Sequence, residues 1–107
     1  MNRDERLAQN EILFRNVNER IKELQSDQWG FEEVDFMCEC ADESCTKVVR
    51  LPSREYERIR NEPTHFLVLP GHEVADVEDV VERHDEYLVV EKHEETEQQV
   101  TAADPRQ

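Results

Sequence analysis

Glycine is scarce in this sequence, which has two glycines and four prolines among 107 residues. So little glycine leaves few places where the backbone could wrap a phosphate, and neither a glycine-rich nucleotide loop nor a Gly-x-Ser-x-Gly nucleophile turn occurs. The metalloprotease pattern His-Glu-x-x-His and the deaminase pattern with Pro-Cys-x-x-Cys are also absent. We therefore expect that the chain is not an enzyme.

Long apolar runs are missing as well, and the opening residues are too polar for the hydrophobic region of a signal peptide. No segment approaches the roughly 20 apolar residues that a membrane-spanning helix needs. The three cysteines are an odd number, which is a poor basis for a disulfide framework. We expect a cytoplasmic protein with reduced cysteines and no membrane contact.

Apolar residues make up 36% of the chain and charged residues 37%, so the hydrophobic core must be thin and in need of further support. The net charge is -14, and all of the acidic excess lies after residue 25. Residues 73–97 carry eleven carboxylates against two cations. This charge would repel phosphate backbones, so nucleic-acid binding is disfavoured.

Residues 1–25 predict an amphipathic helix, because their apolar side chains recur every three, four or seven positions. This face could pack on the rest of the chain. It could equally serve self-association or the docking of a protein partner. The residues that we assign to this face are Leu7, Phe14, Val17, Ile21 and Leu24.

Residues 26–92 predict a small α+β domain. A β-hairpin is expected from two strands, 31–38 and 46–51, and a short helix should follow with Ser53 as its N-cap. Residues 65–69 and 87–90 predict further strands, whereas the valine spacing in 74–81 favours a helix over a strand. Residues 93–107 are polar, and we expect a disordered tail there.

The feature with the clearest chemistry is Cys38-x-Cys40-x4-Cys45, at the tip of the predicted hairpin. A Pro-Gly turn presents His72 further along the chain, and three thiolates with one imidazole form a recognised closed shell for zinc. Such an ion would contribute folding energy that the thin core lacks. We predict a structural zinc site formed by Cys38, Cys40, Cys45 and His72.

Other interpretations of this cluster stay open. The thiols could simply be reduced core residues, or Cys40 and Cys45 could pair as a redox switch, although the neighbouring carboxylates disfavour a low-pKa thiolate. His84 or His65 could replace His72 as the fourth ligand. With no histidine bound, water would leave an open, catalytic metal position at which Glu73 could act as a base.

Four stretches of the sequence resemble a group of short, uncharacterised actinobacterial proteins with a CxCx4C…PGHE pattern. The likeness runs from about residue 10 to residue 92, and it implies a compact domain without implying an activity or a partner. The stretches are Phe36 to Cys45, Leu51 to Glu57, Pro63 to Phe66 and Pro70 to Glu73.

From these features we expect a metal-stabilised interaction or regulatory module. A nucleic-acid-associated or transcriptional zinc protein is an alternative, because arginines at positions 50, 54, 58 and 60 could form a local basic strip. A metal-dependent enzyme with an open zinc position is the other alternative.

Overall fold

The computed structural model describes residues 1–25 and 27–106, beginning with helix α1 (Arg3–Glu23). Local sequence explains where this helix begins, because the Asn2 side chain accepts a hydrogen bond from the Glu5 backbone N–H at 2.8 Å. Acidic residues in the first turn and basic residues in the last turn complement the helix dipole. The predicted N-terminal helix is confirmed. No helix in the described ranges is long and apolar enough to cross a membrane.

The face that α1 buries differs from the face that its apolar spacing predicted. Val17 and Leu24 of the predicted set are exposed, and Leu7 and Ile21 are half-buried. Polar side chains lie inward in their place, where partners from other elements satisfy them, so hydrophobicity alone could not identify this face. The buried residues of α1 are Ala8, Glu11, Ile12, Phe14, Arg15 and Asn18.

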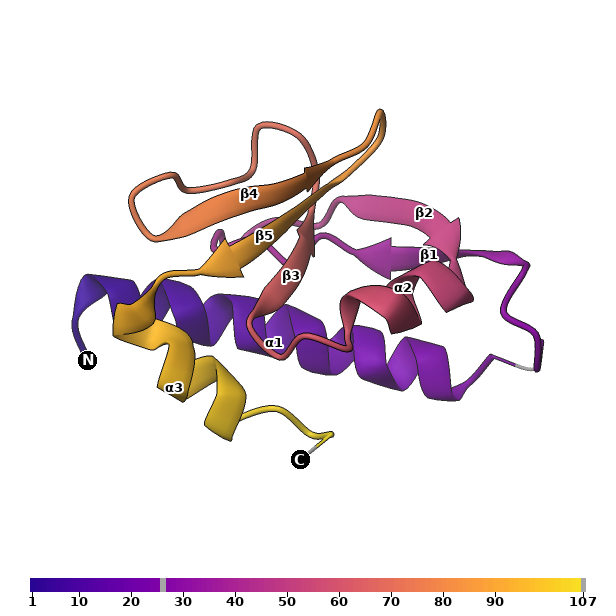
Figure 1. Cartoon of the computed structure of the whole chain (residues 1–107), viewed down its shortest axis with the longest axis horizontal. Helices are drawn as coiled ribbons and strands as arrows, with labels where there is room; N and C mark the ends of the chain where they lie inside the picture. The colour runs from indigo at the N-terminus through magenta and orange to yellow at the C-terminus, as the bar shows by residue number, and fades with distance from the viewer. Residues whose placement is uncertain (26, 107) are drawn as a thin grey trace.

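Strands β1 (Glu33–Met37) and β2 (Val48–Pro52) form the predicted antiparallel hairpin (Figure 1). Inward residues alternate along each strand, and Val34 pairs with Leu51 on the core side. The loop between these strands carries the three cysteines. Helix α2 (Ser53–Ile59) follows directly, with extended Pro52 rather than Ser53 at the N-cap position.

A second antiparallel sheet has the strand order β3-β5-β4, from β3 (His65–Val68), β5 (Leu88–Lys92) and β4 (Glu78–Arg83). The predicted helix over 74–81 is wrong, because residues from Glu78 onward pair with β5. The valine spacing fits a helical turn, but the strand preference of β-branched residues and pairing with the buried β5 prevail. An irregularity between Val80 and Glu82 shifts the register of this pair.

The expected disordered tail is also wrong, because residues Glu94–Ala102 form helix α3. This helix lies beside α1 in Figure 1, and its Val100 side chain is fully buried. Gln99 donates a hydrogen bond to the Glu5 carbonyl at 2.9 Å, and Arg15 donates one to the Val100 carbonyl at 2.8 Å. Composition gave no sign of this order, since the stabilising groups lie more than 80 residues away in α1.

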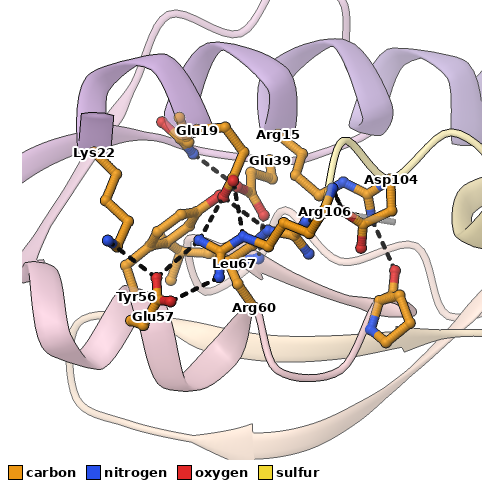
Figure 2. Close-up of polar contacts among 12 residues, drawn as sticks. Arg15, Glu19, Lys22, Glu39, Tyr56, Glu57, Arg60, Leu67, Asp104 and Arg106 are labelled. Atoms are coloured by element: carbon orange, nitrogen blue, oxygen red, sulfur yellow. Dashed lines mark hydrogen bonds and ion pairs between the residues drawn. The ribbon is translucent and has the colours of Figure 1, made fainter. Parts of the chain in front are cut away.

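Buried ion pairs join the beginning and the end of the chain. Arg60 contacts Glu19 at 3.0 Å and Asp104 at 2.5 Å, and its side chain is completely buried. Arg106 adds contacts to Glu19 and Glu57, as Figure 2 shows. Breaking one member of a buried pair is strongly destabilising, so these contacts fix the C-terminal segment on α1 and α2.

A second buried cluster joins α1 to the three-stranded sheet. Lys92 lies 2.6 Å from Glu11 and 3.3 Å from Glu78, and all three side chains are fully buried. Two carboxylates thus share one ammonium group. Burial, and then Glu78, raise the pKa of Glu11 well above its usual value, although Lys92 opposes the shift. The other oxygen of Glu11, Oε2, is buried without a hydrogen-bond partner.

This cluster predicts opposite effects for two substitutions. Lys92→Met removes the one ammonium group that pairs with the buried carboxyl groups of Glu11 and Glu78, and it should lower the free energy of unfolding by about 3–5 kcal/mol in urea titrations. Glu11→Gln balances one carboxylate with one ammonium and should be no less stable than wild type at neutral pH. Equal losses in both variants would contradict this interpretation, and exposed Lys47→Met is the control for Lys92→Met.

The same cluster predicts the pH dependence of stability. Folded Glu11 keeps its proton to a higher pH than unfolded Glu11, whose pKa is near 4.5. Between those two pKa values the folded state binds more protons, so its stability falls as pH rises. The free energy of unfolding of Glu11→Gln should therefore fall less steeply above about pH 4.5. Parallel pH profiles for the two proteins would refute the assignment.

Candidate metal centre

Four potential metal ligands converge at one edge of the fold. The ligand atoms of Cys38, Cys40, Cys45 and His72 all lie within 4.8 Å of one another. The three cysteines are buried free thiols, and the histidine is half-buried. The structure therefore brings together the four residues that the sequence predicted as ligands.

The distances within this cluster suit a single tetrahedral ion. Nδ1 of His72 lies 3.5 Å from the Cys38 sulfur and 3.7 Å from the Cys45 sulfur. Zinc–sulfur bonds of about 2.3 Å and zinc–nitrogen bonds of about 2.0 Å place sulfur and nitrogen about 3.5 Å apart in a tetrahedron. The two measured sulfur–nitrogen distances are therefore close to those that a bound zinc ion requires.

The cysteine loop takes its shape from local hydrogen bonds. The Cys38 N–H donates to the Lys47 carbonyl at 3.1 Å, which extends the β1–β2 ladder into the loop. Asp42 then forms a tight turn, because its carboxylate accepts bonds from the backbone N–H and the hydroxyl of Ser44. Its carbonyl also accepts the Cys45 N–H at 3.0 Å. This turn brings Cys45 back toward the other two thiols.

The histidine reaches the cysteines from the end of β3. Gly71 has a positive φ of 90°, which suits the turn, and the His72 N–H donates to the Leu69 carbonyl at 3.0 Å. The Leu69 N–H donates to the Cys38 sulfur at 3.3 Å, so the same segment also contacts a thiol directly. Glu73 accepts the Gly71 N–H at 2.8 Å and therefore holds the turn.

Glu39 lies between two of the cysteines and is completely buried. Its carboxylate accepts hydrogen bonds from the Tyr56 hydroxyl at 2.5 Å, Asn18 at 2.8 Å and the Leu67 N–H at 2.9 Å. Figure 2 shows this carboxylate among α1, α2 and β3. Burial raises the pKa of Glu39, while the three hydrogen bonds oppose that shift.

Sequence reasoning treated Glu39 as one more acidic neighbour and missed its structural role. The sequence did contain a signal for this role, because successive side chains along an extended backbone point to opposite faces. If the thiols of Cys38 and Cys40 lie on one face, the side chain of Glu39 between them must lie on the other face, toward the core. Helix α1 also contacts this segment. The Asn18 side chain forms hydrogen bonds with the backbone N–H and carbonyl of Met37, and the Asn10 side chain donates to the Ala41 carbonyl.

The thiols differ in acidity because they lie close together. A hydrogen bond with Cys38 is the largest cause that lowers the pKa of Cys40, to about 5, and the same bond raises the pKa of Cys38. Burial is the main cause that raises the pKa of Cys45. The groups that lower the pKa of Cys40 are the neighbouring thiols, His72 and the Asp42 backbone, and no carboxylate is among its main causes. A stabilised thiolate favours cation binding.

His84 and His65, the alternative ligands, are engaged with other residues, and the four arginines do not form one basic strip. His84 stacks on Tyr87 and contacts Glu82, whereas His65 lies 2.9 Å from a carboxylate oxygen of Glu91. Among the four arginines of the expected strip, Arg60 is buried, and the other three are engaged separately. Arg50 pairs with Asp35, Arg58 pairs with Glu82, and Arg54 lies over the Phe31 ring.

Comparison with protein-family models, curated proteins and solved structures finds no match to this chain. Three thiol sulfurs and one imidazole nitrogen are a soft donor set, which suits zinc and other thiophilic ions better than magnesium or calcium.

The position of Glu39 predicts a large effect for its removal. Glu39→Ala leaves three donors in the core without an acceptor and should lower the free energy of unfolding by about 3 kcal/mol or more. Urea unfolding monitored by circular dichroism measures this loss. Glu43→Ala, an exposed change in the same loop, should alter stability by less than about 0.5 kcal/mol. Similar losses in both variants would contradict the anchoring role.

Proposed function

We propose that the chain is a zinc-stabilised interaction module whose Cys3His site has a structural role. The observation that carries this proposal is the match between the sulfur–nitrogen distances and a tetrahedral zinc shell. A bound ion would join the β1–β2 loop to the segment after β3. It would thereby close a long stretch of chain and stabilise a protein that has few apolar residues.

A structural role is favoured over catalysis because the chain offers four ligands and buries three of them. Four protein ligands fill a tetrahedral shell, whereas catalytic zinc keeps one position for water or substrate. Glu73, the expected base of an open site, already holds the backbone of the Gly71 turn. These contacts support a closed site.

An interaction role fits the outer surface better than nucleic-acid binding does. The acidic excess would repel phosphates, and most basic side chains of the expected strip are paired with carboxylates or buried. Docking through α1 stays a prediction for exposed Val17 and Leu24, whereas Phe14 is buried and could not contact a partner. Deletion of α1 would remove core residues, so surface substitutions are the suitable test.

Metal analysis tests the proposed site. Protein purified without chelator should contain one equivalent of zinc, and Cys45→Ser and His72→Ala should each contain less or bind it more weakly. His84→Ala is the matched control, because His84 lies against Tyr87 and Glu82 instead of the thiols. Atomic emission and competition with a chromogenic chelator give the stoichiometry and the relative affinity.

Chelation should also lower the stability of wild type, because binding energy for a structural ion contributes to folding. The midpoint of thermal unfolding should fall when zinc is removed and should recover when zinc is restored. Metal-free protein that unfolds at the same temperature as loaded protein would contradict a structural role. Full zinc retention by His72→Ala would show that another group supplies the fourth ligand.

A further inference from the structure

The described residues between α1 and β1, 24–25 and 27–32, lie at one end of the molecule, at the right of Figure 1. Trp29, the only tryptophan in the chain, is 69% exposed, and Phe31 is 63% exposed. Leu24, where the loop begins, is 73% exposed. In a protein with so few apolar residues, two of the seven aromatics thus lie outside the core.

Hydrogen bonds hold the backbone of residues 27–32 in place. The Asp27 carboxylate accepts the backbone N–H groups of Trp29 at 3.1 Å and Glu32 at 2.8 Å, and these bonds help to lower the pKa of Asp27. The Arg54 N–H donates to the Gly30 carbonyl at 3.0 Å. Gly30 has a positive φ, and an added Cβ would meet the Arg54 nitrogen at 2.9 Å. These contacts fix the backbone that carries Trp29 and Phe31.

A surface cavity of about 380 Å³ lies beside Trp29, and its charged lining consists of Lys22, Arg54 and Arg58 with the carboxylates of Asp27 and Glu57. Lys22 already contacts Glu57, and Arg58 contacts Glu82. The Arg54 guanidinium lies 4.7 Å from the centre of the Phe31 ring and has no ion pair within the described residues. It is therefore a cation with free donors, held against an aromatic face.

We propose that this surface, formed by Trp29, Phe31 and Arg54, binds a peptide segment of another protein that carries a carboxylate beside an apolar side chain. The carboxylate would pair with Arg54, and the apolar side chain would pack on Trp29 and Phe31. Tryptophan and arginine are the residues that dominate binding energy at many interfaces. The inference rests on the proposed interaction role and gives it a partner class.

Charge and shape favour this occupant over others. A nucleic acid would extend its phosphates across a chain with a net charge of -14, whereas a short acidic segment needs only one local cation. Trp29 lines one side of the cavity, and both aromatics are mostly exposed, so the surface suits a peptide better than an enclosed small molecule. A second copy of the chain brings the same net charge, so its approach is opposed electrostatically.

Peptide selection tests the proposal with full-length, zinc-loaded protein. A displayed library of random 12-residue peptides is selected on wild type and counter-selected on Trp29→Ala. Enriched peptides should carry Asp or Glu next to an aromatic or aliphatic residue. One such peptide is then titrated while the emission of Trp29 is recorded, and binding should shift that emission because the indole leaves water.

Matched variants identify the interaction. Arg54→Gln, or a peptide with its carboxylates replaced by amides, should weaken binding by about tenfold, which corresponds to about 1.4 kcal/mol. Arg83→Gln is the control, because Arg83 is an equally exposed arginine on β4 with no ion pair among the described residues. It should bind like wild type. Zinc content measured on every variant separates failure of this surface from failure of the metal site.

Three results would overturn the proposal. The first is that no peptide prefers wild type over Trp29→Ala, and the second is that the enriched peptides are basic. The third is a wild-type dimer in light scattering that Trp29→Ala converts to a monomer, because a second copy would then cover the surface.

Discussion

The structure depends on the segment from Cys38 to Cys40, which belongs to the candidate metal centre and to the core at the same time. Alternation along this extended segment directs two thiols toward His72 and directs Glu39 the opposite way, into contact with α1, α2 and β3. An ion bound by the thiols would therefore act on backbone that the core already holds. The core in turn positions the ligands before any ion arrives, which lowers the entropy that binding must overcome.

Buried charge takes the place of the apolar contacts that this composition cannot supply. Lys92 sits with two carboxylates between α1 and the sheet, and Arg60 joins α1 to the segment after α3. Burial of a charged group costs desolvation free energy that only well-placed partners offset, so the stability of the fold depends on the geometry of these ion pairs. The acidic, polar helix α3 is ordered because Val100 is buried and because Arg15 and Gln99 form hydrogen bonds between α1 and α3.

Sequence reasoning succeeded where a pattern is local and failed where partners lie far away. The ligand set was predictable because the three cysteines are close in sequence and a Pro-Gly turn marks His72. The inward face of α1 was not, since Arg15 and Asn18 become suitable core residues only through carbonyls and carboxylates supplied by other elements. The strand beginning at Glu78 and the helix containing Val100 likewise depend on β5 and α1, which no local window of sequence contains.

The central claim is that one zinc ion is held by three thiolates and one imidazole. X-ray absorption at the zinc edge of the purified protein tests it most directly, because it reports the ligand atoms and their distances. The account predicts three sulfurs at about 2.3 Å and one nitrogen at about 2.0 Å. A shell with fewer sulfurs, a bound water oxygen in place of the imidazole, or no zinc in the protein would contradict it.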